Sequence, residues 1–191
     1  MLNQRQVFLS GTRKVERLPG EVTSLIQELI DSGVHFIVGD APGCDRAFQR
    51  HLASLNQSQV TVFSSAPYVR NNLGNWPSEF IDSGLKSKTN AMHAAKDRRM
   101  AELCDLGIMI WDGQSAGTLA NLLDVVSQGK SAYLYTYLDN EFVKFDDASS
   151  LSNYLESFPE VRNLAAKRLK RDKKRSSKQK VDSSNRPETL F

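Results

Sequence analysis

Short runs of consecutive apolar residues, separated by longer amphipathic stretches, constrain the fold of this chain more than any other feature. Nearly every position within each run is apolar, which predicts strands that are buried on both faces. Strands of that kind belong to parallel sheets, in which a crossover connection, usually a helix, joins each strand to the next. The runs are residues 7–9, 36–38, 60–63, 106–111 and 132–137.

The stretches between these runs have the spacing of amphipathic helices. Between residues 22 and 30, apolar side chains recur every three or four positions, with Pro19 in the expected first turn and Gly33 just past the end. We therefore predict an α/β fold: a Rossmann-like parallel sheet of about five strands with helices on both faces. The other expected helices are 44–55, 91–104, 118–128 and 151–173, the last with an interruption at Pro159.

Two segments do not fit this alternation. Residues 66–88 combine proline, glycine, asparagine and serine with weak periodicity, so we expect a long loop, a type of segment that often serves as a lid. Trp76 in this loop is a candidate lid contact. Residues 142–145 are compatible with a short extra strand.

Charge divides the chain into two parts. Of the 25 basic and 22 acidic residues, ten basic and three acidic ones lie in residues 164–191. Residues 1–163 are expected to form one domain with a small excess of negative charge, and residues 164–191 a basic tail that is helical at first and then disordered. Such a tail suits either nucleic-acid binding through counterion release or a solubilising role. The candidate nucleic-acid contacts are Lys167, Arg168, Lys170, Arg171, Lys173, Lys174 and Arg175.

Several classes of protein are disfavoured by features that the sequence lacks. No run approaches the 18 consecutive apolar residues of a membrane helix, and the N-terminus does not have the pattern of a secretion signal. Cys44 and Cys104 are too few for a disulfide framework, and no His/Cys cluster has metal-ligand spacing. We therefore expect a protein of the reducing cytoplasm, with no membrane partner, metal or cofactor.

Small polar residues follow the apolar runs, at the points where the predicted strands end. They occupy residues 10–13, 39–45, 64–65 and 112–118. In open α/β sheets, ligands bind outside the carboxyl ends of the strands. Four such loops on one edge therefore predict a common pocket.

The loop at residues 112–118 has features of a phosphate site. Gly113 and Gly117 let the backbone approach a ligand closely, and the N–H groups of the following helix suit an anion. Ser115 and Thr118 add hydroxyl donors. The loop is neither GxGxxG nor a Walker A sequence, so a tight turn whose glycines serve geometry alone is an equal alternative.

Acidic and basic side chains near the predicted pocket suggest further roles. Asp40 follows a strand end, where a carboxylate can accept hydrogen bonds from a ribose or base, whereas Asp45 suits a helix cap. On the helix at 91–104, His93 and Asp97 share a face with Lys96. Lys96 is a candidate to neutralise a phosphate, and Asp97 to orient a sugar or act as a base. These residues are also compatible with a solvated helix that makes routine ion pairs.

Two further side chains have alternative interpretations. Trp111 ends a predicted strand, where it either stacks on a base or packs in the core. Cys44 starts a predicted helix, a position that lowers a thiol pKa, but no histidine lies nearby in the sequence. We therefore interpret Cys44 as a small buried residue and not as a nucleophile.

Four motifs in order on successive strand ends resemble the SLOG superfamily, which groups DprA, the LOG phosphoribohydrolases and the YpsA-like proteins. The resemblance covers roughly residues 5–137 and is closest to the standalone YpsA-related branch. It implies a Rossmann-like fold that binds a nucleotide or nucleotide-derived ligand at these loops, and relatives that are often oligomeric. The motifs are Gly11-Thr12-Arg13, Val38-Gly39-Asp40-Ala41 with Gly43 and Asp45, Lys96-Asp97 with Met100-Ala101, and residues 110–118.

The sequence departs from the LOG pattern at three positions. Asp112 stands at the position of a LOG proline, Lys96 at that of the helix arginine, and Asn121 at that of the catalytic glutamate. An asparagine cannot act as a general base, so hydrolysis by the LOG residues themselves is not expected. Asp40, Asp97 or Asp112 is available to substitute for the glutamate.

The main functional prediction is a module that binds a nucleotide or nucleotide derivative at the strand ends. One alternative is an N-glycosidic hydrolase of a nucleoside phosphate, with Asp40 and Asp97 as catalytic candidates. Another is a DNA-binding protein of the DprA type that uses the basic tail; the terminal Leu190-Phe191 also weakly resembles peptides that bind sliding clamps. The candidate ligand contacts are Gly11, Thr12, Arg13, Gly39, Asp40, Ala41, Gly43, Asp45, Ser64, Lys96, Asp97, Asp112, Gly113, Ser115, Gly117 and Thr118.

Overall fold

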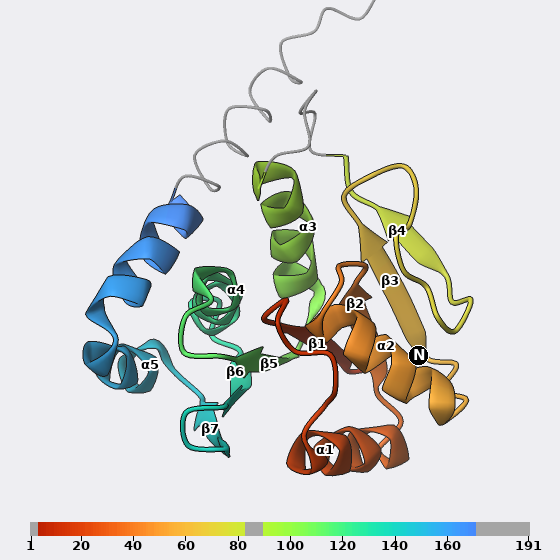
Figure 1. Cartoon of the computed structure of the whole chain (residues 1–191), viewed down its shortest axis with the longest axis horizontal. Helices are drawn as coiled ribbons and strands as arrows, with labels where there is room; N and C mark the ends of the chain where they lie inside the picture. Colours follow the sequence, from red (N-terminus) through yellow and green to blue (C-terminus); the bar gives the residue numbers. More distant parts are fainter. Residues whose placement is uncertain (1–3, 83–89, 171–191) are drawn as a thin grey trace, which may run out of the picture.

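A single seven-stranded sheet forms the centre of the computed structural model, which describes residues 4–82 and 90–170 (Figure 1). The strands lie in the order β4-β3-β2-β1-β5-β6-β7. All neighbours are parallel except β6 and β7, which are antiparallel. The strands are β1 (Gln6–Gly11), β2 (His35–Gly39), β3 (Val60–Ser64), β4 (Ser78–Phe80), β5 (Leu106–Trp111), β6 (Ser131–Thr136) and β7 (Glu141–Phe145).

The helices follow the strands in the alternation that the sequence predicts. A 3-10 turn at Leu155–Ser157 follows α5, and a last helix covers residues 159–170. The interruption expected near Pro159 is therefore present. The other helices are α1 (Gly20–Asp31), α2 (Cys44–Ser54), α3 (Asn90–Leu103), α4 (Ala116–Val126) and α5 (Ala148–Tyr154).

Both faces of the sheet are covered, which is why the central strands are apolar at successive positions. Along β1, Val7 and Leu9 join a core cluster that contains Ile26 of α1 and Phe48 of α2. Phe8 between them joins the opposite cluster, with residues of α3, α4 and α5. Figure 1 shows α1 and α2 on one side of the sheet and α3 and α4 on the other. The predicted α/β fold with helices on both faces is confirmed.

The predicted number of strands was too low: the sheet has seven strands and not about five. One addition is β7, at the segment 142–145 that the sequence left open. The other is β4, which lies inside the expected long loop and pairs with β3 in parallel. Strand β4 has three residues at the edge of the sheet, and none of them is buried. An edge strand of this length needs no apolar run, so periodicity could not reveal it.

Two tryptophans belong to the core. Trp111 is fully buried and contacts the ring of Phe158 edge-on, with 4.9 Å between the ring centroids. Of its two predicted roles, packing is therefore the one observed. Trp76 is also buried, and its indole N–H donates to the backbone oxygen of Gln57 at 2.7 Å, so it anchors its loop to the body.

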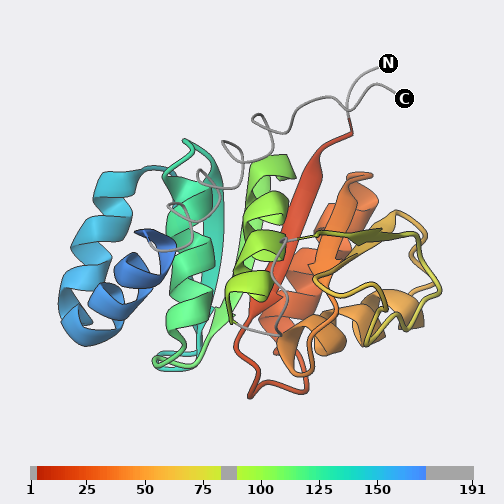
Figure 2. The ribbon, with the colours of Figure 1, turned by 90° about the horizontal axis from the view of Figure 1, so that it is seen from above.

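The C-terminal helix over residues 159–170 packs against the same face as α3 and α4. Ala165 is fully buried in that core cluster, together with the partly buried Phe158 and Val161. Figure 2 shows the helix beside α4. Residues 164–170 of the predicted tail therefore lie against the body. The predictions for Arg171, Lys173, Lys174, Arg175 and Leu190-Phe191 fall outside the described residues.

Within residues 4–82 and 90–170, no helix is both long enough and apolar enough to cross a bilayer.

A charge introduced at Ala165 should detach the C-terminal helix. We expect Ala165→Asp to lower the free energy of unfolding by about 2–4 kcal/mol, because an unpaired carboxylate would enter the core. The matched control is Leu164→Asp, since the neighbouring Leu164 is 57% exposed, and it should change stability by less than about 0.5 kcal/mol. Urea denaturation measures the free energy of unfolding of both variants. If the two substitutions lower it equally, the helix does not pack against the body through Ala165.

Candidate functional site

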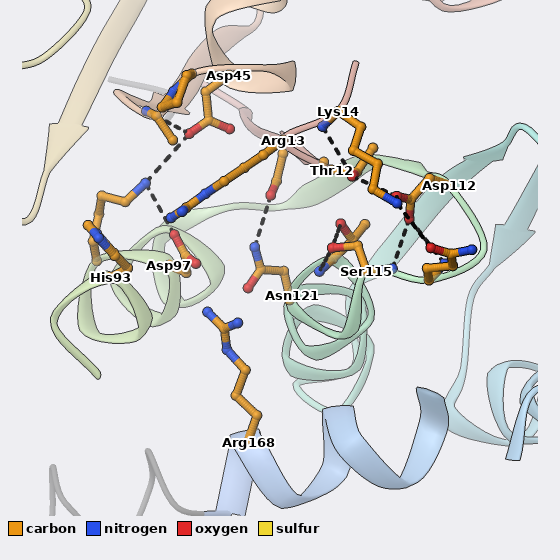
Figure 3. Close-up of a pocket in the computed structure, with 18 of the residues that line it drawn as sticks. Thr12, Arg13, Lys14, Asp45, His93, Asp97, Asp112, Ser115, Asn121 and Arg168 are labelled. Atoms are coloured by element: carbon orange, nitrogen blue, oxygen red, sulfur yellow. Dashed lines mark hydrogen bonds and ion pairs between the residues drawn. The ribbon is translucent and has the colours of Figure 1, made fainter. Parts of the chain in front are cut away.

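A cavity of about 450 Å³ lies at the carboxyl edge of the sheet, where the loops after β1, β2 and β5 meet α3 and the C-terminal helix (Figure 3). Strand order reverses here: β2 lies on one side of β1, and β5 on the other. In open α/β sheets this crevice is where ligands bind. Three of the four polar loops that the sequence placed at one edge therefore line the same cavity, whereas the loop at 64–65 does not.

The structure brings together most of the predicted ligand contacts. Those that line the cavity are Gly11, Thr12, Arg13, Ala41, Asp45, Lys96, Asp97, Asp112, Ser115, Gly117 and Thr118. The predicted residues outside its lining are Gly39, Asp40, Gly43, Ser64 and Gly113. Lining residues that the ligand prediction did not include are Ser10, Lys14, Pro42, Arg70, His93, Gln114, Asn121 and Arg168.

Asp112 joins the loops after β1 and β5. Its Oδ1 accepts hydrogen bonds from the backbone N–H of Gln114 at 3.1 Å and Ser115 at 2.8 Å. Its Oδ2 accepts one from the Thr12 hydroxyl at 3.0 Å and lies 3.3 Å from Lys14 Nζ. Burial raises the pKa of Asp112, but these hydrogen bonds outweigh it and lower the pKa below its ordinary value. Asp112 therefore holds the rim of the cavity in place as a carboxylate.

The first turn of α4 faces the cavity beside this rim. Ser115 caps the helix: its Oγ accepts from the Thr118 backbone N–H at 3.3 Å and from the Thr118 hydroxyl at 2.9 Å. One turn further on, the side-chain amide of Asn121 donates to Ser10 Oγ at 2.9 Å. This amide contact fixes α4 to the end of β1.

A buried lysine joins α3 to α2. Lys96 Nζ lies 3.2 Å from Asp97 Oδ1 and 3.8 Å from Asp45 Oδ2. Burial lowers the pKa of Lys96, but the charges of Asp97, Asp45 and Asp40 outweigh it and raise the pKa, so the lysine stays charged. Its charge is already balanced by carboxylates, which weakens the predicted role of neutralising a phosphate.

Asp45 and Gly39 complete this buried cluster. Asp45 Oδ2 also accepts from the Ala41 backbone N–H at 3.2 Å, and burial raises the pKa of this carboxyl. The predicted cap is wrong: the N-cap of α2 is Gly43, which has no side chain, and Asp45 lies in the first turn of the helix. A Cβ atom on Gly39 would collide with both Asp45 and Lys96. Gly39 thus supports the site by leaving room for the lysine and its partner.

Asp40 is sealed from the cavity by an arginine of the 66–82 segment. Its carboxylate is fully buried and accepts from Arg70 Nε at 3.0 Å, from Arg70 Nη2 and from the Arg70 backbone N–H at 3.2 Å. Ser64 Oγ lies 3.2 Å from the same carboxylate. Burial raises the pKa of Asp40, but the hydrogen bonds and charge of Arg70, with the charge of Lys96, lower it below its ordinary value. The pair anchors the segment after β3, and Arg70 lines the cavity.

His93 and Asp97 both line the cavity from α3, on the helix face that their spacing predicts. His93 Nδ1 lies 2.8 Å from the hydroxyl of Ser65. Burial lowers the pKa of His93, and the charges of Arg70 and Arg13 lower it further. The imidazole is therefore neutral at pH 7 and can serve as a hydrogen-bond partner.

The remaining predicted residues occupy other positions. Gly43 packs against the backbone of Arg13, and Gly113 against the side chain of Leu138. In the basic segment, Lys167 and Lys170 are exposed, whereas Arg168 is half-buried and lines the cavity. In the part of the chain that the structure describes, no group of three or more His, Cys, Asp or Glu side chains could hold a metal ion.

Comparison of the chain with protein-family models, curated proteins and solved structures finds no match. The resemblance to the SLOG superfamily therefore stays a prediction based on its motifs. The case for a ligand depends on the shape, charge and donors of the cavity itself.

Removal of Arg70 should destabilise the protein in a pH-dependent way. We expect Arg70→Gln to cost about 3 kcal/mol at pH 7, because it leaves Asp40 buried without its partner. The folded-state pKa of Asp40 is below its unfolded value of about 3.9. The contribution of the pair is therefore fully present well above pH 4 and is lost as the pH falls through the folded-state pKa. Chemical denaturation between pH 7 and pH 3 should show the gap between wild type and variant closing in acid.

Arg99→Gln is the matched control for this experiment. Arg99 is 44% exposed and pairs with Glu79 and Glu102 at 3.8 Å, so its loss should change stability by less than about 0.5 kcal/mol. If Arg70→Gln is no more destabilising than this control, the buried pair does not anchor the segment.

Proposed function

We propose that this protein binds a nucleotide or nucleotide-derived ligand in the cavity at the carboxyl ends of β1, β2 and β5. The observation that carries the proposal is the cavity itself: about 450 Å³ at the point where strand order reverses. That volume falls within the range of about 300–1,000 Å³ for small-molecule sites. Its lining contains five Arg or Lys side chains and three Asp side chains, which favours an anionic ligand.

The α4 side of the cavity suits the phosphate of such a ligand. Gly117 lies in the first turn of α4, where the backbone N–H groups and the helix dipole attract anions. Arg13 and Lys14, from the loop after β1, line the same cavity and add positive charge. These groups give an anion both charge and hydrogen-bond donors.

The α3 side suits the sugar and base. Asp97 lines the cavity with a carboxylate whose side chain is 18% exposed, so it can accept hydrogen bonds from ribose hydroxyls. The neutral His93 stands one helical turn before it and offers a ring face and a polar nitrogen. A ligand that spans the cavity would meet phosphate donors at one end and sugar acceptors at the other.

Hydrolysis of an N-glycosidic bond is a second candidate, favoured by one observation: the Asp97 carboxylate lies in the cavity, whereas Asp40 does not line it. In such a reaction Asp97 would activate water or stabilise the developing cation of the sugar ring. Lys96 Nζ lies 3.2 Å from Asp97 Oδ1 and helps to position this carboxylate.

Thermal shift with nucleosides, nucleotides and cyclic nucleotides tests the binding function. At a ligand concentration of 100 Kd, the gain of about 2.7 kcal/mol should raise the Tm by about 5–10 °C. Gly117→Asp should abolish this shift without unfolding the protein, because it adds a carboxylate where a Cβ atom would lie 3.0 Å from Arg168 Nη1. Gly20→Asp is the control, since it adds the same charge at the start of α1 in open space. If no nucleotide shifts the Tm of the wild type, the proposal is wrong.

Product analysis tests the hydrolytic candidate. With a nucleoside monophosphate as substrate, we expect any release of free base to fall by at least about 100-fold in Asp97→Asn. Glu102→Gln, an exposed position on the same helix, should leave the rate unchanged. A wild type that binds nucleotides but releases no base has the binding function alone.

A further inference from the structure

Arg168 reaches the cavity from an element outside the loops that form its rim. It lies on the helix over residues 159–170, which packs against the body through the fully buried Ala165. Figure 3 shows its guanidinium pointing toward Asn121 and the cavity, with Arg13 entering from the opposite side. The basic segment thus contributes one of its charges to the cavity.

Arg13 and Arg168 differ from the other cations of the cavity. Lys14 pairs with Asp112, Arg70 with Asp40, and Lys96 with Asp97. The side chains of Arg13 and Arg168 make no hydrogen bond or ion pair with any residue in 4–82 or 90–170. Among the described residues, Arg13 and Arg168 are therefore the two guanidinium groups of the cavity without a paired carboxylate.

The surroundings of Arg168 favour a phosphate group. A Cβ atom on Gly117 would lie 3.0 Å from Arg168 Nη1, so the absence of a side chain there lets the guanidinium approach the first turn of α4. A guanidinium presents planar paired donors that match phosphate oxygens, and two guanidinium groups can contact the same phosphate from opposite sides. Phosphomonoesters and terminal diphosphates are close to dianionic at pH 7, whereas internal phosphodiesters carry a single charge.

We propose that Arg168 and Arg13 form a subsite for a terminal phosphate, so that the cavity selects ligands with a free phosphomonoester or diphosphate end. The identity of the rest of the ligand as a nucleoside rests on the proposed function; the phosphate subsite does not. The C-terminal helix is then part of the binding site, and a bound phosphate holds it against α4.

The test measures affinity by calorimetry with the full chain. The probes are a nucleoside, its 5′-monophosphate, its cyclic monophosphate, inorganic pyrophosphate and a short DNA duplex. Arg168→Gln should weaken the affinity for the monophosphate and for pyrophosphate by about 10–100-fold. This factor corresponds to the loss of a charge-assisted hydrogen bond, which contributes about 1.5–3 kcal/mol. Affinity for the nucleoside should stay within twofold. Lys167→Gln removes the same charge from an exposed neighbour and should leave the affinities for the nucleoside, the monophosphate and pyrophosphate unchanged.

Two further measurements separate a direct contact from a structural effect. Arg168→Lys keeps the charge but loses the planar fork, so its affinity for pyrophosphate should lie between those of wild type and Arg168→Gln. Pyrophosphate should slow amide hydrogen exchange in residues 159–170 of the wild type but not of Arg168→Gln, because only the wild type links the helix to the anion.

The outcomes distinguish the subsite from the proposed function. If Arg168→Gln binds the monophosphate and pyrophosphate as wild type does, the subsite is wrong and nucleotide binding stands. If wild type binds pyrophosphate through Arg168 but no nucleotide, the subsite stands and the proposed function is wrong. If Arg168→Gln weakens only the affinity for the DNA duplex, the residue belongs to a nucleic-acid surface and the proposed phosphate subsite is wrong.

Discussion

Strand β1 is buried on both faces and paired in parallel on both edges, and the remaining structure is arranged around it. Phe8 packs toward one layer of helices, and Val7 and Leu9 toward the other. Because β2 and β5 run parallel to β1 on either side, their carboxyl ends open at the same edge. The loops that follow diverge there to α2 and α4, which leaves the cavity between them. The position of the site is thus a consequence of how the central strand is buried.

Most carboxylates at this edge have a structural task. Asp112 joins two loops, Asp40 holds Arg70, and Asp45 shares Lys96 with Asp97. Burying these charges is tolerable only because each has partners within hydrogen-bond or ion-pair distance. Such internal pairs determine which charges of the cavity are already balanced within the protein. In the part of the chain that the structure describes, Arg13 and Arg168 line the cavity without a paired carboxylate.

The sequence predicted features that depend on a short stretch of chain, such as strands and their exit loops. It could not predict contacts between side chains that lie far apart in the chain. The apolar runs located the central strands, and the polar residues after them located the cavity, because both follow from a short stretch of chain. The partner of Asp40 is Arg70, thirty residues away in a segment without periodicity. Arg168 has six basic neighbours between residues 167 and 175, so composition favoured a solvated tail. Only the packing of Ala165 places it at the cavity.

The two edges of the sheet also affect whether another strand can be added to it. An unpaired edge strand presents free N–H and C=O groups that can template the addition of another strand. Strand β4 offers only three residues, and β7 carries the exposed Glu141 and Lys144. A short edge on one side and a charged edge on the other both disfavour strand addition. The apolar central strands, which would aggregate most readily as exposed edges, therefore lie inside the sheet between β4 and β7.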